Sequence, residues 1–148
     1  MDVDYVSIDI DSCDLQVFSE LVKVYRPKLI SVEYNSHYEC NESKVTICER
    51  EGPNGPERFQ NLKNNIYGAS LLALARVGEA AGYVLVWVVP GLDAWFVEEQ
   101  LVCAGTAPAF ADFCGSTGRA GTCGEGGSCR FHRDSTEEQR ARWVRDYP

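Results

Sequence analysis

Residues 5–11 read YVSIDID, a run of β-branched and aromatic residues that stops at acidic ones. Such a run is typical of a β-strand whose end leads into a helix. Apolar residues then recur at steps of three and four over residues 15–25, which predicts an amphipathic helix that ends before Pro27. We expect Asp11 to cap this helix and Asp14 to lie in its first turn.

The rest of the first hundred residues continues the alternation of strands and helices. A strand is predicted at residues 29–34 (LISVEY), so the order strand, helix, strand indicates a βαβ unit with parallel strands. Residues 36–67 show little periodicity and predict a long loop, either a functional lid or a disordered insertion. A helix is predicted at residues 69–81, and residues 83–89 and 94–97 predict an antiparallel hairpin.

Size and charge limit the classes of function. The chain has 148 residues, enough for one domain with a hydrophobic core. Its net charge is −8, and residues 1–111 hold 16 acids against 8 bases, which argues against broad nucleic-acid binding there. The N-terminus is too acidic for a secretory signal and no apolar run suits a membrane helix. We therefore expect an intracellular protein, cytoplasmic or nuclear, with no membrane partner.

Polar residues follow both predicted parallel strands. Open α/β sheets bind ligands at the carboxyl ends of their strands. Oxygen ligands that converge there could hold a hard cation such as Mg²⁺, or one carboxylate could act as a general base. The same residues could instead cap a helix or face water. The candidate catalytic residues are Asp9, Asp11, Asp14, Glu33 and Asn35.

Taken in order, several segments resemble the C-terminal half of FkbM-type, S-adenosylmethionine-dependent methyltransferase-like domains. The resemblance implies a partial Rossmann-like, class I methyltransferase-type fold over residues 1–103: a mixed sheet with flanking helices and a C-terminal hairpin. The first strand would be the fourth of seven, and the hairpin the sixth and seventh. The resembling segments are YVSIDID at residues 5–11 with Asp14, PKLISVEYN at 27–35, YGASL at 67–71, GY at 82–83 and DAWFV at 93–97.

The family builds its cofactor site on an earlier strand with a glycine-rich turn, and nothing upstream of Tyr5 supplies one. We therefore assign no cofactor-binding residues, and expect S-adenosylmethionine to bind only if an upstream half or a partner chain is present. The first hypothesis is an incomplete methyltransferase-like domain that is not catalytic alone. In an active enzyme, Asp9 or Asp11 would position or deprotonate an acceptor hydroxyl. A fragment of an active O-methyltransferase is an alternative, and the sheet should present an unpaired edge to which another chain could add.

The composition changes at residue 104 towards Gly, Ala, Pro, Cys and Arg. This change predicts a linker at 104–111, a small module at 112–134 and a short C-terminal helix at 135–148. Four residues of the module, separated by 8, 5 and 2 residues, offer the donors of a structural zinc site. These candidate zinc ligands are Cys114, Cys123, Cys129 and His132.

The module looks like a CCCH-type zinc finger, whose usual last spacing is three residues instead of two. Such fingers often bind single-stranded RNA by stacking bases on aromatic side chains, here Phe113 and Phe131, although a protein partner is as plausible. The second hypothesis is therefore a non-enzymatic, zinc-dependent binding protein with the α/β part as scaffold. We expect Cys13 and Cys103 to be semi-buried thiols, and no metal at His37, Cys40 and Cys48.

Overall fold

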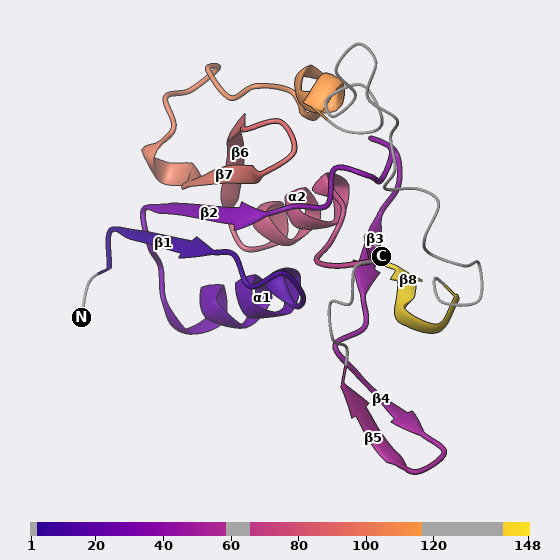
Figure 1. The fold of residues 1–148 in the computed structure, drawn as a ribbon. Helices are drawn as coiled ribbons and strands as arrows, with labels where there is room; N and C mark the ends of the chain where they lie inside the picture. Colours follow the sequence, from indigo (N-terminus) through magenta and orange to yellow (C-terminus); the bar gives the residue numbers. More distant parts are fainter. Residues whose placement is uncertain (1–2, 59–65, 117–140) are drawn as a thin grey trace.

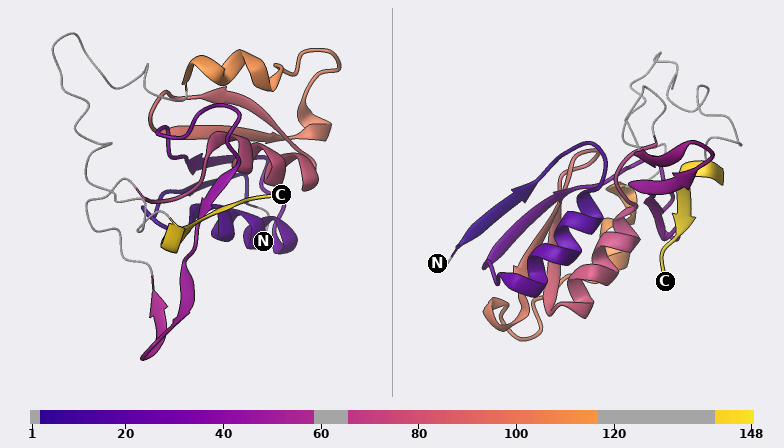
Figure 2. Two further views of the ribbon diagram at one scale, coloured as in Figure 1. Left: turned by 90° about the vertical axis from the view of Figure 1, so that its right-hand side faces the viewer. Right: turned by 90° about the horizontal axis from the view of Figure 1, so that it is seen from below.

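The computed structural model describes residues 3–58, 66–116 and 141–148. These residues form a mixed α/β structure whose main sheet has four strands in the order β1-β2-β7-β6. Helices α1 and α2 contact each other and lie on the same face of this sheet (Figure 1, Figure 2). The predicted mixed sheet with flanking helices is therefore confirmed.

The first unit is the predicted strand, helix, strand. It consists of β1 (Tyr5–Ile8), α1 (Asp14–Val24) and β2 (Leu29–Glu33), and the two strands are parallel neighbours. Helix α1 ends at Val24, and Tyr25 takes an extended backbone conformation. Pro27 has no N–H with which to continue the helical hydrogen bonds, and it disfavours a helical conformation of the residue before it.

The second half supplies the other helix and the predicted hairpin. Helix α2 (Leu71–Ala80) begins after Ser70, whose hydroxyl accepts a hydrogen bond from a backbone N–H of the first turn at 3.2 Å. Strands β6 (Tyr83–Val88) and β7 (Asp93–Glu98) are antiparallel, as predicted. Strand β7 lies between β2 and β6 and runs antiparallel to both, so the closing strand occupies the interior of the sheet.

The core lies between the sheet and the two helices. Alternate residues of the central strands face the helices, and among them Ile30, Val32 and Phe96 are completely buried. Phe18 of α1 meets Phe96 with the ring centroids 5.1 Å apart. Burial of one such side chain contributes roughly 1.5–3 kcal/mol, so the alternation of apolar residues decides which face of the sheet receives the helices.

Residues 36–67, predicted to be a loop, contain three short strands. They are β3 (Lys44–Thr46), β4 (Glu49–Gly52) and β5 (Gly55–Arg58). Strands β4 and β5 form a hairpin that projects from the domain (Figure 1), joined by ion pairs from Arg50 to Glu57 at 3.0 Å and from Arg58 to Glu49 at 3.2 Å. The sequence prediction missed these strands because they are polar and too short to show a period.

The C-terminal segment also differs from its prediction. Residues 144–146 form strand β8 (Val144–Asp146), antiparallel to β3, instead of continuing a helix. The 3-10 helices η1 (Glu99–Leu101) and η2 (Phe110–Ser116) follow the hairpin. Phe113 of η2 is 9 % exposed and belongs to the main core, so the predicted boundary between a linker at 104–111 and a separate module at 112–134 does not hold for η2.

Two disulfides join distant segments of the described residues. Cys13 pairs with Cys48 and Cys40 pairs with Cys114, with Cα atoms 5.7 and 5.2 Å apart. The expectation of a thiol at Cys13 is therefore wrong, and Cys103, expected to be semi-buried, is an exposed free cysteine. Disulfides are more typical of oxidising compartments than of the cytosol, so they do not support the predicted intracellular location.

The contact between α2 and β7 leads to a first prediction. A Cβ atom added at Gly78 would lie 2.8 Å from two ring carbons of Phe96. In most helices a glycine-to-alanine change stabilises by about 1 kcal/mol. Here we expect Gly78→Ala to lower the free energy of unfolding by about 1–3 kcal/mol because it overpacks the core. Urea unfolding measures the change.

The matched control replaces the phenyl ring that the new methyl group meets with a smaller side chain. Phe96→Leu alone should destabilise, but Gly78→Ala with Phe96→Leu should cost less than the sum of the two single changes. Strict additivity, or a stabilising Gly78→Ala, would contradict this packing.

Candidate functional site

The candidate site lies where β1 ends, and its geometry is set by a buried carboxylate. The Asp14 side chain is completely buried and accepts hydrogen bonds from the backbone N–H groups of Ile10, at 2.8 Å, and Ser12, at 3.1 Å. These bonds hold the turn between β1 and α1. Asp11 sits in this turn with a φ of +57°, which a non-glycine residue rarely adopts.

The expected helix cap is placed differently in the structure. The residue before α1 is Cys13, which makes no side-chain cap, and Asp11 does not cap the helix. Asp14 lies in the first turn, as predicted, but it binds the preceding turn instead of facing solvent. Asp9 and Asp11 are consequently left exposed at the end of β1.

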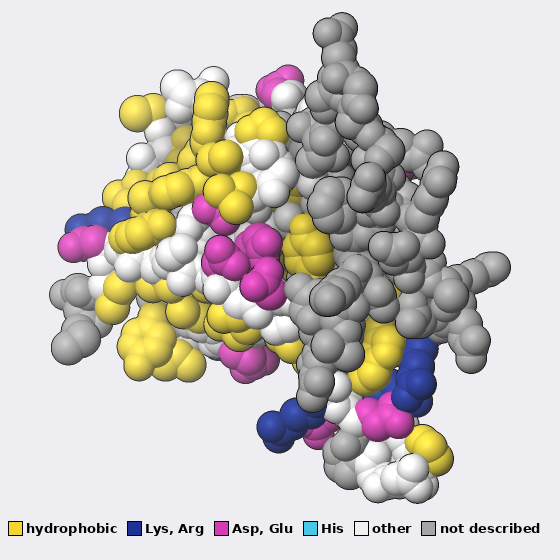
Figure 3. Space-filling model, viewed as in Figure 1, with side chains coloured by type: hydrophobic (Ala, Val, Ile, Leu, Met, Phe, Trp, Pro, Cys, Tyr) yellow, Lys and Arg dark blue, Asp and Glu magenta, His cyan; other side chains and the backbone are white. Residues whose placement is uncertain are grey.

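Three of the five candidate catalytic residues converge. Asp9, Asp11 and Glu33 each offer a carboxylate oxygen, and these oxygens lie within 4.8 Å of one another. Glu33, at the end of β2, is half-buried, whereas Asp9 and Asp11 are exposed. In the space-filling view, acidic side chains gather on the open face just beyond β1 (Figure 3). We call Asp9, Asp11 and Glu33 the carboxylate cluster.

The remaining candidate, Asn35, is completely buried and holds the backbone around the cluster. Its amide nitrogen donates to the carbonyl oxygen of Tyr67 at 3.1 Å, and its side-chain oxygen accepts from the N–H of His37 at 3.0 Å. Its own backbone N–H donates to the carbonyl of Ala69 at 2.8 Å. Asp14 and Asn35 therefore hold the backbone around the cluster, and Asp14 is not one of the carboxylates that converge.

Burial and mutual repulsion alter the proton affinity of the cluster. Burial, followed by the charges of Asp9, Asp14, Asp11 and Asp93, raises the pKa of Glu33 to about 8. Atom Oε2 of Glu33 is buried without a hydrogen-bond partner among the described residues. Glu33 is therefore mostly protonated at neutral pH, and the cluster combines a largely neutral carboxyl group with acidic neighbours.

Two residues near the cluster were not among the sequence candidates. Asp93 faces Glu33 across the β2–β7 pair, and burial together with Asp9 raises its pKa. Burial and the charges of Glu33 and Asp11 raise the pKa of the Tyr67 phenol. Both residues lie in segments that resemble the methyltransferase-like domains, Tyr67 in residues 67–71 and Asp93 in residues 93–97, so a signal for each existed. The position of Asp93 opposite Glu33 depends on strand register, which the sequence did not reveal.

The candidate zinc ligands lie mostly outside the described residues, since this applies to Cys123, Cys129 and His132. The fourth, Cys114, is joined to Cys40 and as a disulfide cannot offer a thiolate. Phe113, expected to stack on RNA bases, is instead buried against the sheet. The predicted stacking residue Phe131 also lies outside the described residues.

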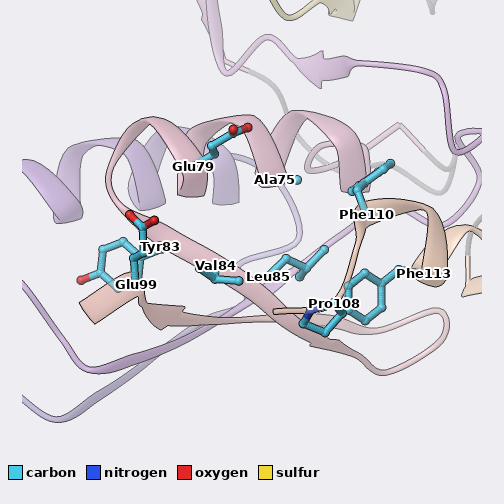
Figure 4. Close-up of a pocket in the computed structure, with 9 residues that line it drawn as sticks. All are labelled: Ala75, Glu79, Tyr83, Val84, Leu85, Glu99, Pro108, Phe110 and Phe113. Carbon is cyan, nitrogen blue, oxygen red and sulfur yellow. The ribbon is translucent and has the colours of Figure 1, made fainter. Parts of the chain in front are cut away.

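A cavity of about 330 Å³ lies away from the carboxylate cluster, between α2, β6 and η2. The Tyr83 and Phe113 rings line it with Glu79 and Glu99 (Figure 4). None of the five candidate catalytic residues lines this cavity.

Comparisons with known proteins do not assign this chain to a family. No family model matches the sequence, and neither the curated proteins nor the solved structures contain a match. Among the helices of the described segments, none has the length and apolar character needed to cross a membrane. The candidate site therefore has to be judged on its own geometry.

The raised pKa of Glu33 leads to a second prediction. A carbon-13 NMR titration of the Glu33 carboxyl should give a pKa of about 8, and Asp9→Asn should lower this pKa because the largest charge repulsion on Glu33 is removed. The folded chain then binds more protons than the unfolded chain between pH 4.5 and about 8. The free energy of unfolding should therefore fall as the pH rises through this range.

Glu33→Gln should abolish this fall in stability, whereas Glu51→Gln, at an exposed position in the β4–β5 hairpin, should leave it unchanged. A Glu33 pKa that stays close to 4.5 in the wild-type chain would show that the cluster is solvated and uncoupled.

Proposed function

We propose that this chain is the acceptor-side part of a methyltransferase-like domain, in which the carboxylate cluster binds an acceptor hydroxyl group and takes up its proton. The observation that carries the proposal is the convergence of Asp9, Asp11 and Glu33 at the carboxyl ends of two parallel strands. Ligands of open α/β sheets bind at this edge.

The arrangement of the sheet supports the same class. The resemblance assigns β1 as the fourth strand of seven, and β6 and β7 as the sixth and seventh. Two parallel strands followed by an antiparallel hairpin are present in that order. Strand β1 lies at the edge of the sheet, which is where strands of an earlier half would add. The Rossmann-like class thus rests on strand order together with the quoted sequence segments.

The chemistry follows from the unequal members of the carboxylate cluster. Paired carboxyl groups whose proton affinities differ can divide the roles of acid and base. Asp9 or Asp11 would accept the proton of an acceptor hydroxyl, leaving its oxygen more nucleophilic. The neutral carboxyl of Glu33 would donate a hydrogen bond to these carboxylates and fix their orientation. Asp14 and Asn35 would serve as positioning residues.

The described residues offer S-adenosylmethionine no glycine-rich turn between a strand and a helix. In the turns before α1 and α2, several backbone N–H groups are already used within the fold. Before α1, the N–H groups of Ile10 and Ser12 already bind Asp14. Before α2, the N–H of Ala73 already binds Ser70. Among the glycines, Gly52 and Gly55 lie in the β4–β5 hairpin and precede no helix.

Calorimetric titration of the chain with S-adenosylmethionine tests the proposal. We expect affinity weaker than about 1 mM, because the described residues offer no glycine-rich turn for the cofactor and several backbone donors before α1 and α2 are used within the fold. Submicromolar to micromolar binding would overturn the assignment of an acceptor-side part without a cofactor site. If such binding occurred, the Asp9→Asn variant would show whether the chain is a complete enzyme. In a complete enzyme, this variant should keep its affinity for S-adenosylmethionine and lose methyl transfer.

A zinc-dependent binding role for the tail stays a separate proposal, and the disulfide at Cys114 sets its condition. Zinc ligation by this cysteine requires that Cys40 first release it by reduction. The reduced chain should then hold about one zinc ion, lost in Cys123→Ser, and the oxidised chain should hold none. Metal analysis under both conditions decides, with Cys103→Ser as the control. Equal zinc content in the two states would show that Cys114 is not a ligand.

A further inference from the structure

The outer edge of β1 offers backbone groups for pairing. The N–H of Leu29 donates to the carbonyl of Asp4 at 3.0 Å, and β1 and β2 are parallel with Tyr5 opposite Leu29. Because bonding directions alternate along a parallel pair, the backbone groups of Tyr5 and Ser7 point away from β2. No strand pairs with this edge within residues 3–58, 66–116 and 141–148.

Helix α1 presents an apolar groove next to this edge. Val17, Leu21, Val24 and Tyr25 line the groove together with the stems of Gln16 and Glu20. Val24 is 72 % exposed and Tyr25 is 50 % exposed, although both are large apolar side chains. The helix contacts both β1 and β2, so it lies close to the open edge of the sheet (Figure 1, Figure 2).

The charges at the two ends of β1 differ, and they select the direction of a pairing strand. The carboxylate cluster lies at the carboxyl end, with Asp93 close by. The amino end carries Arg26 and Lys28, each joined to an acid, so its charge is balanced. If β1 of a second copy paired in parallel, the two acidic carboxyl ends would lie together. If it paired antiparallel, each acidic carboxyl end would lie beside the charge-balanced amino end of the other copy, which carries cations.

We propose that a second copy of this chain pairs with the β1 edge in an antiparallel direction, in the place that strands of an earlier half would otherwise take, forming a two-fold symmetric dimer. A two-fold axis perpendicular to the sheet, midway between Val6 or Ser7 and its symmetry mate, matches the faces of both copies and continues the four strands of one copy into those of the other. The free groups of Tyr5 and Ser7 would then be satisfied by their symmetry mates.

The spacing of the helices supports this arrangement. Each α1 contacts both β1 and β2, and the corresponding strand pairs of the two copies are two strand spacings apart. Two spacings amount to about 9.6 Å, within the 8–10 Å at which helices pack. The grooves of the two α1 helices would therefore meet, and Val17, Leu21 and Val24 of each copy would be covered by the other.

Sedimentation velocity on the full chain, in a Cys103→Ser background that excludes a cross-link through this exposed cysteine, tests the dimer. We expect a species of twice 16.5 kDa that dissociates on dilution. Ser7→Pro removes an outward N–H, and Val24→Glu puts a charge into the α1 groove. Each should weaken the dimer at least about tenfold.

Leu101→Glu is the matched control, because this residue is 50 % exposed and lies on η1, outside the proposed interface. It should leave dissociation unchanged. Circular dichroism shows whether each variant folds. If Ser7→Pro does not fold, Val24→Glu alone decides the test. A chain that stays monomeric at all concentrations overturns the proposal. A dimer that resists both substitutions equally overturns this interface.

Discussion

The carboxyl ends of strands β1 and β2 depend on the backbone of one short segment, residues 67–70. Gly68 donates its N–H to the carbonyl of Ser12 at 2.8 Å and accepts the N–H of Thr46 at 2.9 Å. Its neighbours bind Asn35 and Lys44 in the same way. The turn after β1, the end of β2 and strand β3 are therefore joined through one piece of chain. Gly68 has a φ of +51°, which explains a glycine at this point.

This junction makes a concentration of negative charge possible. Carboxylates that repel one another separate unless the backbone that carries them is fixed. Here the turn with Asp9 and Asp11 is fixed by Asp14. The disulfide from Cys13 to Cys48 attaches the end of this turn to the segment between β3 and β4. The loop after β2 is attached to η2 through Cys40. The repulsion consequently adds to burial in raising the pKa of Glu33.

The parts of the fold that the sequence predicted are those with a local signal. The period of apolar residues in α1 and the alternation in β1 and β2 do not depend on distant residues, and the convergence of Asp9 with Glu33 follows from parallel pairing alone. The missed parts depend on contacts between distant residues. Strand β3 lies between its partner β8 and residues 68–70, and Asp93 reaches the cluster through the register of β2 and β7. Composition could not show the partners of Cys13 and Cys114.

The pairing of β3 with β8 has a consequence for how the protein folds during its synthesis. Lys44 and Asp146 form an ion pair at 2.6 Å although 102 residues separate them along the chain. The strand-helix-strand unit, the hairpin and the contact of β3 with residues 68–70 can form while translation continues, but the pairing of β3 with β8 has to wait for residues 144–146. Closing so long a loop is slow, because its entropy is lost before the contact stabilises the chain. Until then β3 is a nascent edge, exposed to chaperones and to pairing with the wrong strand.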